Sequence, residues 1–202
     1  GEPPDYGFLY TGKGLDFDGA TDYIDITETS TMTVFTISAW FKTTSTDGSG
    51  INIVSGTNAG YYAMTVRGGI LKWYDGSDWR GAITVNDGNW HYGVQVFNAG
   101  NHTIYVDGVK DYDNDEGSYS NGTFTTIGHL QGAARYFDGS ISNAQIWDAV
   151  WSESDVQYAY THPEKLALNN SGTSLTESNL KLWYPMNEGN PRSPQTTVYD
   201  AT

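Results

Sequence analysis

Residues 88–109 read GNWHYGVQVFNAGNHTIYVDGV, which is two runs of alternating side chains on either side of a short turn. In the runs at 90–97 and 102–108, apolar side chains recur at every second position, the pattern of a β-strand with two different faces. The intervening Ala99-Gly100-Asn101 is typical of a tight turn. The segment therefore predicts a β-hairpin.

The same alternation recurs along much of the chain. In FTISAWFK at 35–42, Ile37, Ala39 and Phe41 fall on one face of a strand, and Ser38, Trp40 and Lys42 fall on the other. Turn residues such as Asp75-Gly76 and Asp138-Gly139 separate the runs. Further strands are expected at 51–55, 61–67, 70–74, 124–128, 141–148 and 180–186. About ten short strands of this kind predict an all-β sandwich or barrel.

One segment has helical spacing instead. Ser152 can cap a helix with Asp155 three residues later, and Val156, Ala159 and Tyr160 keep a helical period until Pro163. We therefore expect one short helix near 153–161.

Composition excludes several classes of protein. The chain has 202 residues, no cysteine, and 24 acidic against 10 basic side chains, for a net charge of −14. Without cysteine it is neither a disulfide-stapled mini-protein nor a thiol enzyme. A strongly acidic chain lacks the basic face that nucleic-acid binding requires, so we expect no nucleic-acid partner. No apolar run is long enough to span a membrane.

Four blocks, in order, resemble one known family. They are GKGLDFDGATDYIDI at 12–26, FTISAWFK at 35–42, the hairpin at 88–109 and YFDGSISNAQIWDAVWSESDV at 136–156. Together they resemble the laminin-G-like, concanavalin A-like jelly rolls of secreted bacterial, marine and phage surface proteins. The resemblance implies a jelly-roll sandwich of two antiparallel sheets, with the first and last strands of the matched region side by side.

The C-terminal segment allows two interpretations. NLKLWYPMNEG and TVYDAT, within 179–202, resemble the opening strand of the same family. The segment either begins a following repeat or closes this sandwich. We favour a single domain over 1–202, because an unpaired strand with Leu182 and Trp183 would expose a large apolar edge.

Catalysis is not expected. Sandwich glucanases carry their carboxylates on alternate residues of one strand, as in Glu-x-Asp-x-Glu, and no such triplet occurs. The sequence also lacks a Gly-x-Ser-x-Gly elbow, and each of the four histidines is more simply a packing or surface residue. A glycan hydrolase or lyase with a dispersed carboxylate site remains the alternative.

Calcium is the expected cofactor, as a structural ion, because hard cations bind clustered oxygen ligands. Two sets of aspartates supply such oxygens: Asp16, Asp18, Asp22 and Asp138 near the first and last strands, and Asp111, Asp113 and Asp115 in a predicted loop. The second set lacks the glycine and glutamate spacing of an EF-hand. The competing interpretation is that these aspartates cap turns.

Carbohydrate is the ligand class that the resemblance implies. Exposed aromatic rings can stack on sugar faces while polar groups bind the hydroxyls. The candidate ligand-binding residues surround WYDGSDWR at 73–80 and the strand before it: Asn58, Tyr61, Tyr62, Trp73, Tyr74, Asp75, Asp78 and Trp79. Since neighbours on a strand face opposite ways, one of Trp73 and Tyr74 should belong to the core.

These observations predict a non-catalytic carbohydrate-binding or adhesion module of an extracellular, cell-surface or virion protein. Its partner would be a glycan or a cell-surface polysaccharide. A structural spacer or protein-interaction module, next to further repeats of a longer chain, is the second alternative.

Overall fold

The structure is a computed structural model that describes residues 13–26, 29–56, 64–74, 78–115, 122–130, 132–163, 165–168, 173–186, 198, 200 and 201. Thirteen strands and three helical segments follow one another in these residues. The strands are β1 (Leu15–Asp18), β2 (Ile24–Asp25), β3 (Val34–Lys42), β4 (Ile51–Gly56), β5 (Met64–Arg67), β6 (Ile70–Tyr74), β7 (Trp79–Arg80), β8 (His91–Asn98), β9 (Asn101–Val106), β10 (Val109–Asp115), β11 (Phe124–Ile127), β12 (Asp138–Trp147) and β13 (Leu180–Tyr184). The helical segments are α1 (Glu153–Thr161), α2 (Lys165–Leu168) and the 3₁₀ turn η2 (Glu177–Asn179).

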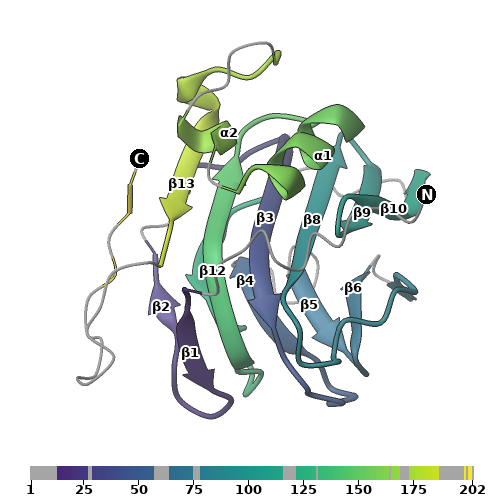
Figure 1. Cartoon of the computed structure of the whole chain (residues 1–202), viewed down its shortest axis with the longest axis vertical. Coiled ribbons are helices and arrows are strands. Elements are labelled where there is room, and N and C mark those ends of the chain that lie inside the picture. Colours follow the sequence, from purple (N-terminus) through teal and green to yellow (C-terminus); the bar gives the residue numbers. More distant parts are fainter. Residues whose placement is uncertain are drawn as a thin grey trace.

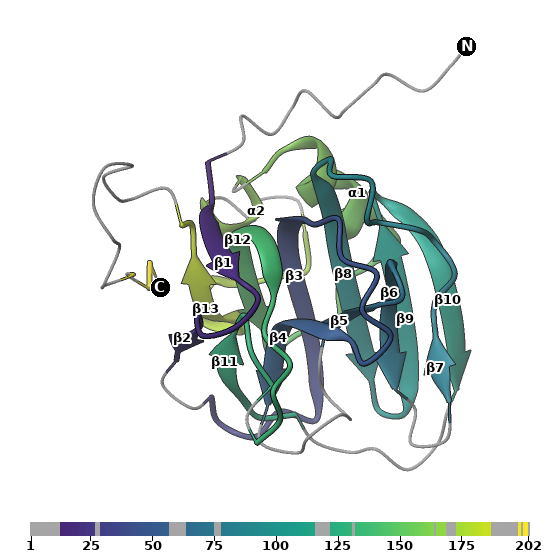
Figure 2. The ribbon, with the colours of Figure 1, turned by 90° about the horizontal axis from the view of Figure 1, so that it is seen from below.

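The strands form two antiparallel sheets that pack face to face (Figures 1 and 2). The seven-stranded sheet has the order β1-β12-β3-β8-β9-β10, with β13 also paired to β12. The six-stranded sheet has the order β2-β11-β4-β5-β6-β7. The predicted all-β sandwich is confirmed, and the first strand lies beside the last strand of the matched region, with Asp18 opposite Asp138.

Strand β3 shows why the two layers form. Its residues Phe35, Ile37, Ala39 and Phe41 enter the core between the sheets, as the alternation predicts. Phe35 stacks on Phe97 of β8 at 5.0 Å between ring centroids, and Phe124 of β11 meets Phe35 edge-on from the opposite sheet. Burying these large side chains supplies most of the driving force for closing the sandwich.

The outer face of the seven-stranded sheet is also covered. Trp40, Tyr92 and Trp147 on this face pack with Val156 and Ala159 of α1. The helix begins where predicted: the Ser152 side chain accepts a hydrogen bond from the Asp155 amide, and Asp155 caps the Ser152 amide in return. Figure 1 shows α1 lying across the front of β3 and β8. No helix in the described residues is long and apolar enough to cross a membrane.

Two strands differ in how well the sequence indicates them. Strand β13 forms within the predicted 180–186 run and pairs with β12, with Ala144 opposite Tyr184 and Ile146 opposite Leu182. Residues 111–115, expected in a loop, instead belong to strand β10, which pairs with β9. Aspartate is depleted in strands, so the three aspartates of this segment indicate a loop in the sequence. Pairing with the neighbouring strand overrides that preference.

Candidate functional site

Two partly exposed aromatic rings meet at one edge of the six-stranded sheet. Tyr74 of β6 and Trp79 of β7 are directly opposite each other in the register of this hairpin. Their ring centroids are 5.2 Å apart with the planes tilted by 42°. We call this pair the Trp79 platform. The sequence predicted both residues as ligand-binding, and the structure brings them together.

Charged groups surround the Trp79 platform. The guanidinium of Arg67, at the end of β5, lies 4.7 Å from the Trp79 ring centroid. Asp78 accepts a hydrogen bond from the Trp79 amide at 2.7 Å and forms an ion pair with Arg80 at 3.3 Å. An aromatic surface with a carboxylate and guanidinium groups beside it can stack on a sugar ring and hydrogen-bond its hydroxyls.

Trp73 has a different role from its neighbours. Its side chain is 0% exposed and lies in the core between the sheets, where its ring is 3.7 Å from that of His102. It therefore cannot contact a ligand, and it is the core member of the Trp73–Tyr74 pair. Asn58, Tyr61, Tyr62 and Asp75 lie outside the described residues.

The first set of aspartates gathers where β1 and β12 meet. The carboxylate of Asp18 accepts hydrogen bonds from the amides of Ala20, Thr21 and Asp22 and from the Thr21 hydroxyl. These backbone hydrogen bonds, led by that of Thr21, hold the pKa of Asp18 well below its usual range. Asp16 accepts a hydrogen bond from the Ser140 hydroxyl. Asp18 thus forms an Asx turn, and a calcium ion here would compete with that turn for the carboxylate.

The second set of aspartates is dispersed. Asp111 accepts hydrogen bonds from the amides of Ala82 and Ile83, at 2.9 and 3.2 Å. Asp113 pairs with Lys110 at 2.9 Å, and Lys110 lowers its pKa. Asp115 ends strand β10. Among the described residues, no three His, Asp or Glu side chains form a group that could hold a metal ion.

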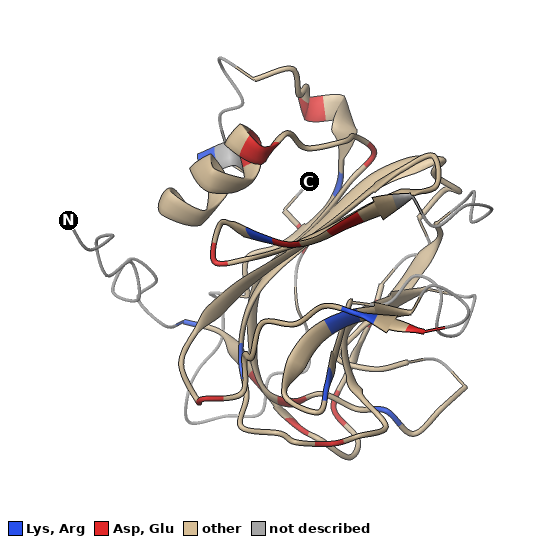
Figure 3. Cartoon of the chain, turned by 90° about the vertical axis from the view of Figure 1, so that its right-hand side faces the viewer, with Lys and Arg blue, Asp and Glu red and all other residues tan. Residues whose placement is uncertain are grey.

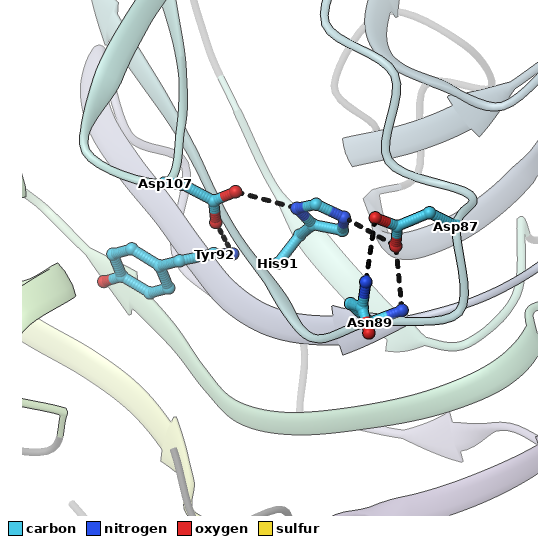
Figure 4. A network of polar contacts seen from close by, with 5 residues as sticks. All are labelled: Asp87, Asn89, His91, Tyr92 and Asp107. Atoms are coloured by element: carbon cyan, nitrogen blue, oxygen red, sulfur yellow. Dashed lines mark hydrogen bonds and ion pairs between the residues drawn. The ribbon is translucent and has the colours of Figure 1, made fainter. Parts of the chain in front are cut away.

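A histidine held between two carboxylates stabilises the loop before β8 (Figure 4). His91 Nδ1 lies 2.7 Å from Asp107, and Nε2 lies 3.1 Å from Asp87. Burial by itself would lower the pKa of His91, but the hydrogen bonds and charges of Asp107 and Asp87 outweigh it and raise the pKa. The Asp107 carboxylate also accepts a hydrogen bond from the Tyr92 amide, which connects the β9–β10 turn to β8.

The two carboxylates of this network engage both nitrogens of the His91 ring. Both ring nitrogens of His91 face carboxylates, so the ring has no nitrogen left to activate a nucleophile. The sequence predicted a packing or surface role for His91 but did not identify its partners. The sequence signal for this partner is Asp107-Gly108, a dipeptide typical of a tight turn. In the structure Asp107 has a positive φ of 52°, as such a turn requires.

The acidic charge is unevenly distributed in space. Asp18, Asp87, Asp107 and Asp138 lie at strand ends that meet at one end of the seven-stranded sheet, since β1, β12, β8 and β9 are antiparallel neighbours or next neighbours there. Figure 3 shows acidic positions in the loops at one end of the sandwich and others on the helical segments at the opposite end. An acidic end of this kind repels polyanions and favours cations.

Comparisons with known proteins agree with the sandwich fold. The sequence model of the concanavalin A-like lectin/glucanases superfamily matches residues 18–157. No curated protein sequence matches the chain.

Solved structures with similar folds have little sequence similarity to this chain. A candidate carbohydrate-binding protein from Bacteroides ovatus is 17% identical with a TM-score of 0.69, over 94% of this chain and 56% of its own. The heptameric SAP-like pentraxin of Limulus polyphemus is 16% identical with a TM-score of 0.58, over 72% of this chain and 80% of its own. Domain 4 of AbnA, an extracellular arabinanase from Geobacillus stearothermophilus solved with arabinotriose, is 18% identical with a TM-score of 0.55, over 73% and 76%.

Proposed function

Because this chain belongs to the concanavalin A-like lectin/glucanases superfamily, we propose that it is a non-catalytic carbohydrate-binding module of an extracellular or virion-surface protein. The observation that carries the proposal is the Trp79 platform, a pair of partly exposed rings at a sheet edge with Arg67, Asp78 and Arg80 beside it. The AbnA domain, which shares the fold and was solved with arabinotriose, supports a sugar as the ligand class.

The chemistry of the platform suits a neutral sugar. The parts of the Tyr74 and Trp79 rings that the Arg67 guanidinium does not cover offer apolar surface for the C–H groups of a pyranose or furanose. Asp78 is exposed and can accept hydroxyl hydrogen bonds, whereas Arg67 can donate them. A strongly anionic polysaccharide would be repelled by the net charge of −14.

The test is glycan binding by a matched pair of variants. Oligosaccharide panels that include arabinotriose, read by calorimetry, should show binding by the wild-type chain. Trp79→Ala should weaken it about five- to tenfold, since losing one stacked ring costs about 1–1.5 kcal/mol. Tyr158→Ala removes a ring that is 40% exposed on α1 and should leave affinity unchanged. Equal affinity of Trp79→Ala and wild type would contradict the proposed site.

Two further results would contradict other parts of the proposal. Release of reducing ends from any bound polysaccharide would make the chain a hydrolase or lyase and so overturn its non-catalytic character. Complete absence of glycan binding by the wild-type chain would favour a spacer or protein-interaction module instead.

A further inference from the structure

A second group of aromatic rings lies at the opposite edge of the six-stranded sheet. Tyr23 directly precedes β2, and His129 and Tyr136 face each other as a bridged pair just after β11. The rings of His129 and Tyr136 stack at 4.3 Å with 18° between their planes. Tyr23 lies 5.2 Å from the His129 ring and 6.3 Å from the Tyr136 ring. We call these three residues the Tyr23 platform.

The platform is rigidly supported from behind. The Gly128 amide donates a hydrogen bond to the Ile53 carbonyl of β4, at 2.8 Å. The Phe137 amide donates one to the Gly128 carbonyl, also at 2.8 Å, and so closes the 128–137 segment. His129 is held in its orientation by a hydrogen bond from Nε2 to the Ala133 carbonyl at 2.9 Å. The His129 carbonyl in turn accepts the Thr126 hydroxyl at 2.7 Å. A surface that is already ordered loses little conformational entropy when it binds a ligand.

The outer ring of the platform is open to solvent. Tyr23 is 46% exposed, and within the part of the chain that the structure describes its hydroxyl has no hydrogen-bond partner. Asp22 and Asp25, both exposed, flank it in sequence, and Arg135 precedes Tyr136. The other large apolar side chains that are well exposed among the described residues, Val109 and Tyr158, lie on other elements. The platform is therefore a small aromatic patch with polar neighbours and not part of a wide apolar surface.

We propose that Tyr23, His129 and Tyr136 form a second carbohydrate-binding site, in which the face of Tyr23 stacks on one sugar ring and its hydroxyl, Asp22 or Asp25 bind the ring hydroxyls. This inference rests on the proposed carbohydrate-binding function. A protein partner would need a contiguous apolar patch of several hundred Å² to bury, which a single exposed ring does not supply. A sugar ring matches the size and the mixed chemistry of the patch.

The two platforms are too far apart for one short ligand. They lie at β2 and β7, the two edges of the six-stranded sheet, and are separated by five strand intervals. At about 4.8 Å per strand this is about 24 Å. A polysaccharide chain can engage both sites at once, in which case the second contact is intramolecular and raises the overall affinity.

The experiment removes each platform alone and both platforms together, so that the contribution of each to binding can be measured separately. Binding of xylohexaose, cellohexaose, laminarihexaose, arabinotriose and the corresponding polysaccharides is measured by calorimetry for wild type, Tyr23→Ala, Trp79→Ala and the double variant. Tyr158→Ala serves as the matched control, since its ring is similarly exposed and stacks on His162 at 4.4 Å. Melting curves of every variant show that it is folded.

We expect Tyr23→Ala to weaken binding of at least one of these glycans fivefold or more, and to do so in the Trp79→Ala background as well. Tyr23→Phe should retain most of the stacking. A bound glycan should also shift the ring NMR signal of His129 in Trp79→Ala, and that shift should disappear in the double variant.

The outcomes separate this site from the Trp79 platform. If Trp79→Ala abolishes all binding and Tyr23→Ala matches wild type, the second site is wrong and the proposed function stands. If Trp79→Ala matches wild type while Tyr23→Ala loses binding, the second site stands and the Trp79 platform is wrong. Binding lost equally in Tyr158→Ala would mean that the effect is not specific to this patch and would overturn the inference.

Discussion

At the scale of single residues, the partly buried His91 and the fully buried His102 have opposite electrostatic environments. His91 is held between Asp87 and Asp107, which raise its pKa, so its stabilising contribution is present below its unfolded pKa and is lost as the pH rises through the folded value. His102 is 1% exposed among Trp73 and Phe97, and neither of its ring nitrogens has a hydrogen-bond partner among the described residues. Burial lowers the pKa of His102 to about 3.

His102 should therefore destabilise the fold in acid. The folded state resists protonating this ring, whereas the unfolded state takes up a proton near pH 6.5, so stability falls as the pH drops from 6.5 towards 3. His102→Leu removes this proton linkage. Relative to wild type, the variant should gain about 2 kcal/mol of unfolding free energy between pH 7 and pH 5, measured by urea denaturation.

The exposed His162 at the end of α1 offers a matched control for this measurement. His162→Leu makes the same substitution at an exposed histidine, so it controls for the added leucine side chain. A stability difference between His102→Leu and wild type that stays constant from pH 7 to pH 5 would contradict the prediction.

At the scale of elements, a buried polar network joins β12 to β13. The Asn143 side-chain oxygen accepts hydrogen bonds from Trp183 Nε1 at 2.7 Å and from Gln145 Nε2 at 2.9 Å. Gln145 accepts in turn from Trp147 Nε1 at 2.9 Å. Asn143 lies in an irregularity of the β3–β12 register and has a positive φ of 48°, which aims its side chain at Trp183.

Removing the acceptor of this network should be costly. Asn143→Gly keeps the left-handed backbone without strain but leaves the buried donors of Trp183 and Gln145 unpaired, so unfolding free energy should fall by about 2–3 kcal/mol. Asn143→Ala should lower the unfolding free energy by about 1 kcal/mol more, because the Cβ of alanine is strained at a positive φ. Urea denaturation followed by tryptophan fluorescence measures both. If Asn143→Gly is as stable as wild type, the network does not hold β13 in place.

At the scale of the whole molecule, several aspartates lie at one end of the seven-stranded sheet. Asp18 and Asp138 are opposite each other across the β1–β12 pair, with Asp16 two residues along the same strand, in a chain of net charge −14. Like charges at such short spacing repel one another, and a divalent cation would relieve that repulsion. Structural calcium remains a prediction from the sequence.

A calcium ion bound only to the folded state must raise the melting temperature. If calcium binds at this end, wild type should melt about 5 °C or more higher in millimolar CaCl₂ than in EDTA. Asp138→Asn should reduce that difference, whereas Asp113→Asn, on the distant β10, should leave it intact. The same melting temperature in calcium and in EDTA would exclude a structural ion.

Sequence reasoning recovered the elements whose signal is local. Alternating apolar residues identified β3, β8 and β9, and a capping box with helical spacing identified α1. It failed for β10, because the pairing of its aspartates depends on neighbouring strands. It named Tyr74 and Trp79 as candidates, because they flank a short turn, but not the Tyr23 platform, in which Tyr23 is 106 and 113 residues away from His129 and Tyr136.

The sequence alone determined the all-β sandwich, its single main helix and the acidic character of its surface, because periodicity, capping residues and charge are properties of neighbouring residues. Only the tertiary structure decided that Trp73 belongs to the core, that Asp18 is engaged by a turn, and that Tyr23 meets His129 and Tyr136. Those outcomes depend on which strands pair and which faces the two sheets bury against each other, and long-range packing sets both.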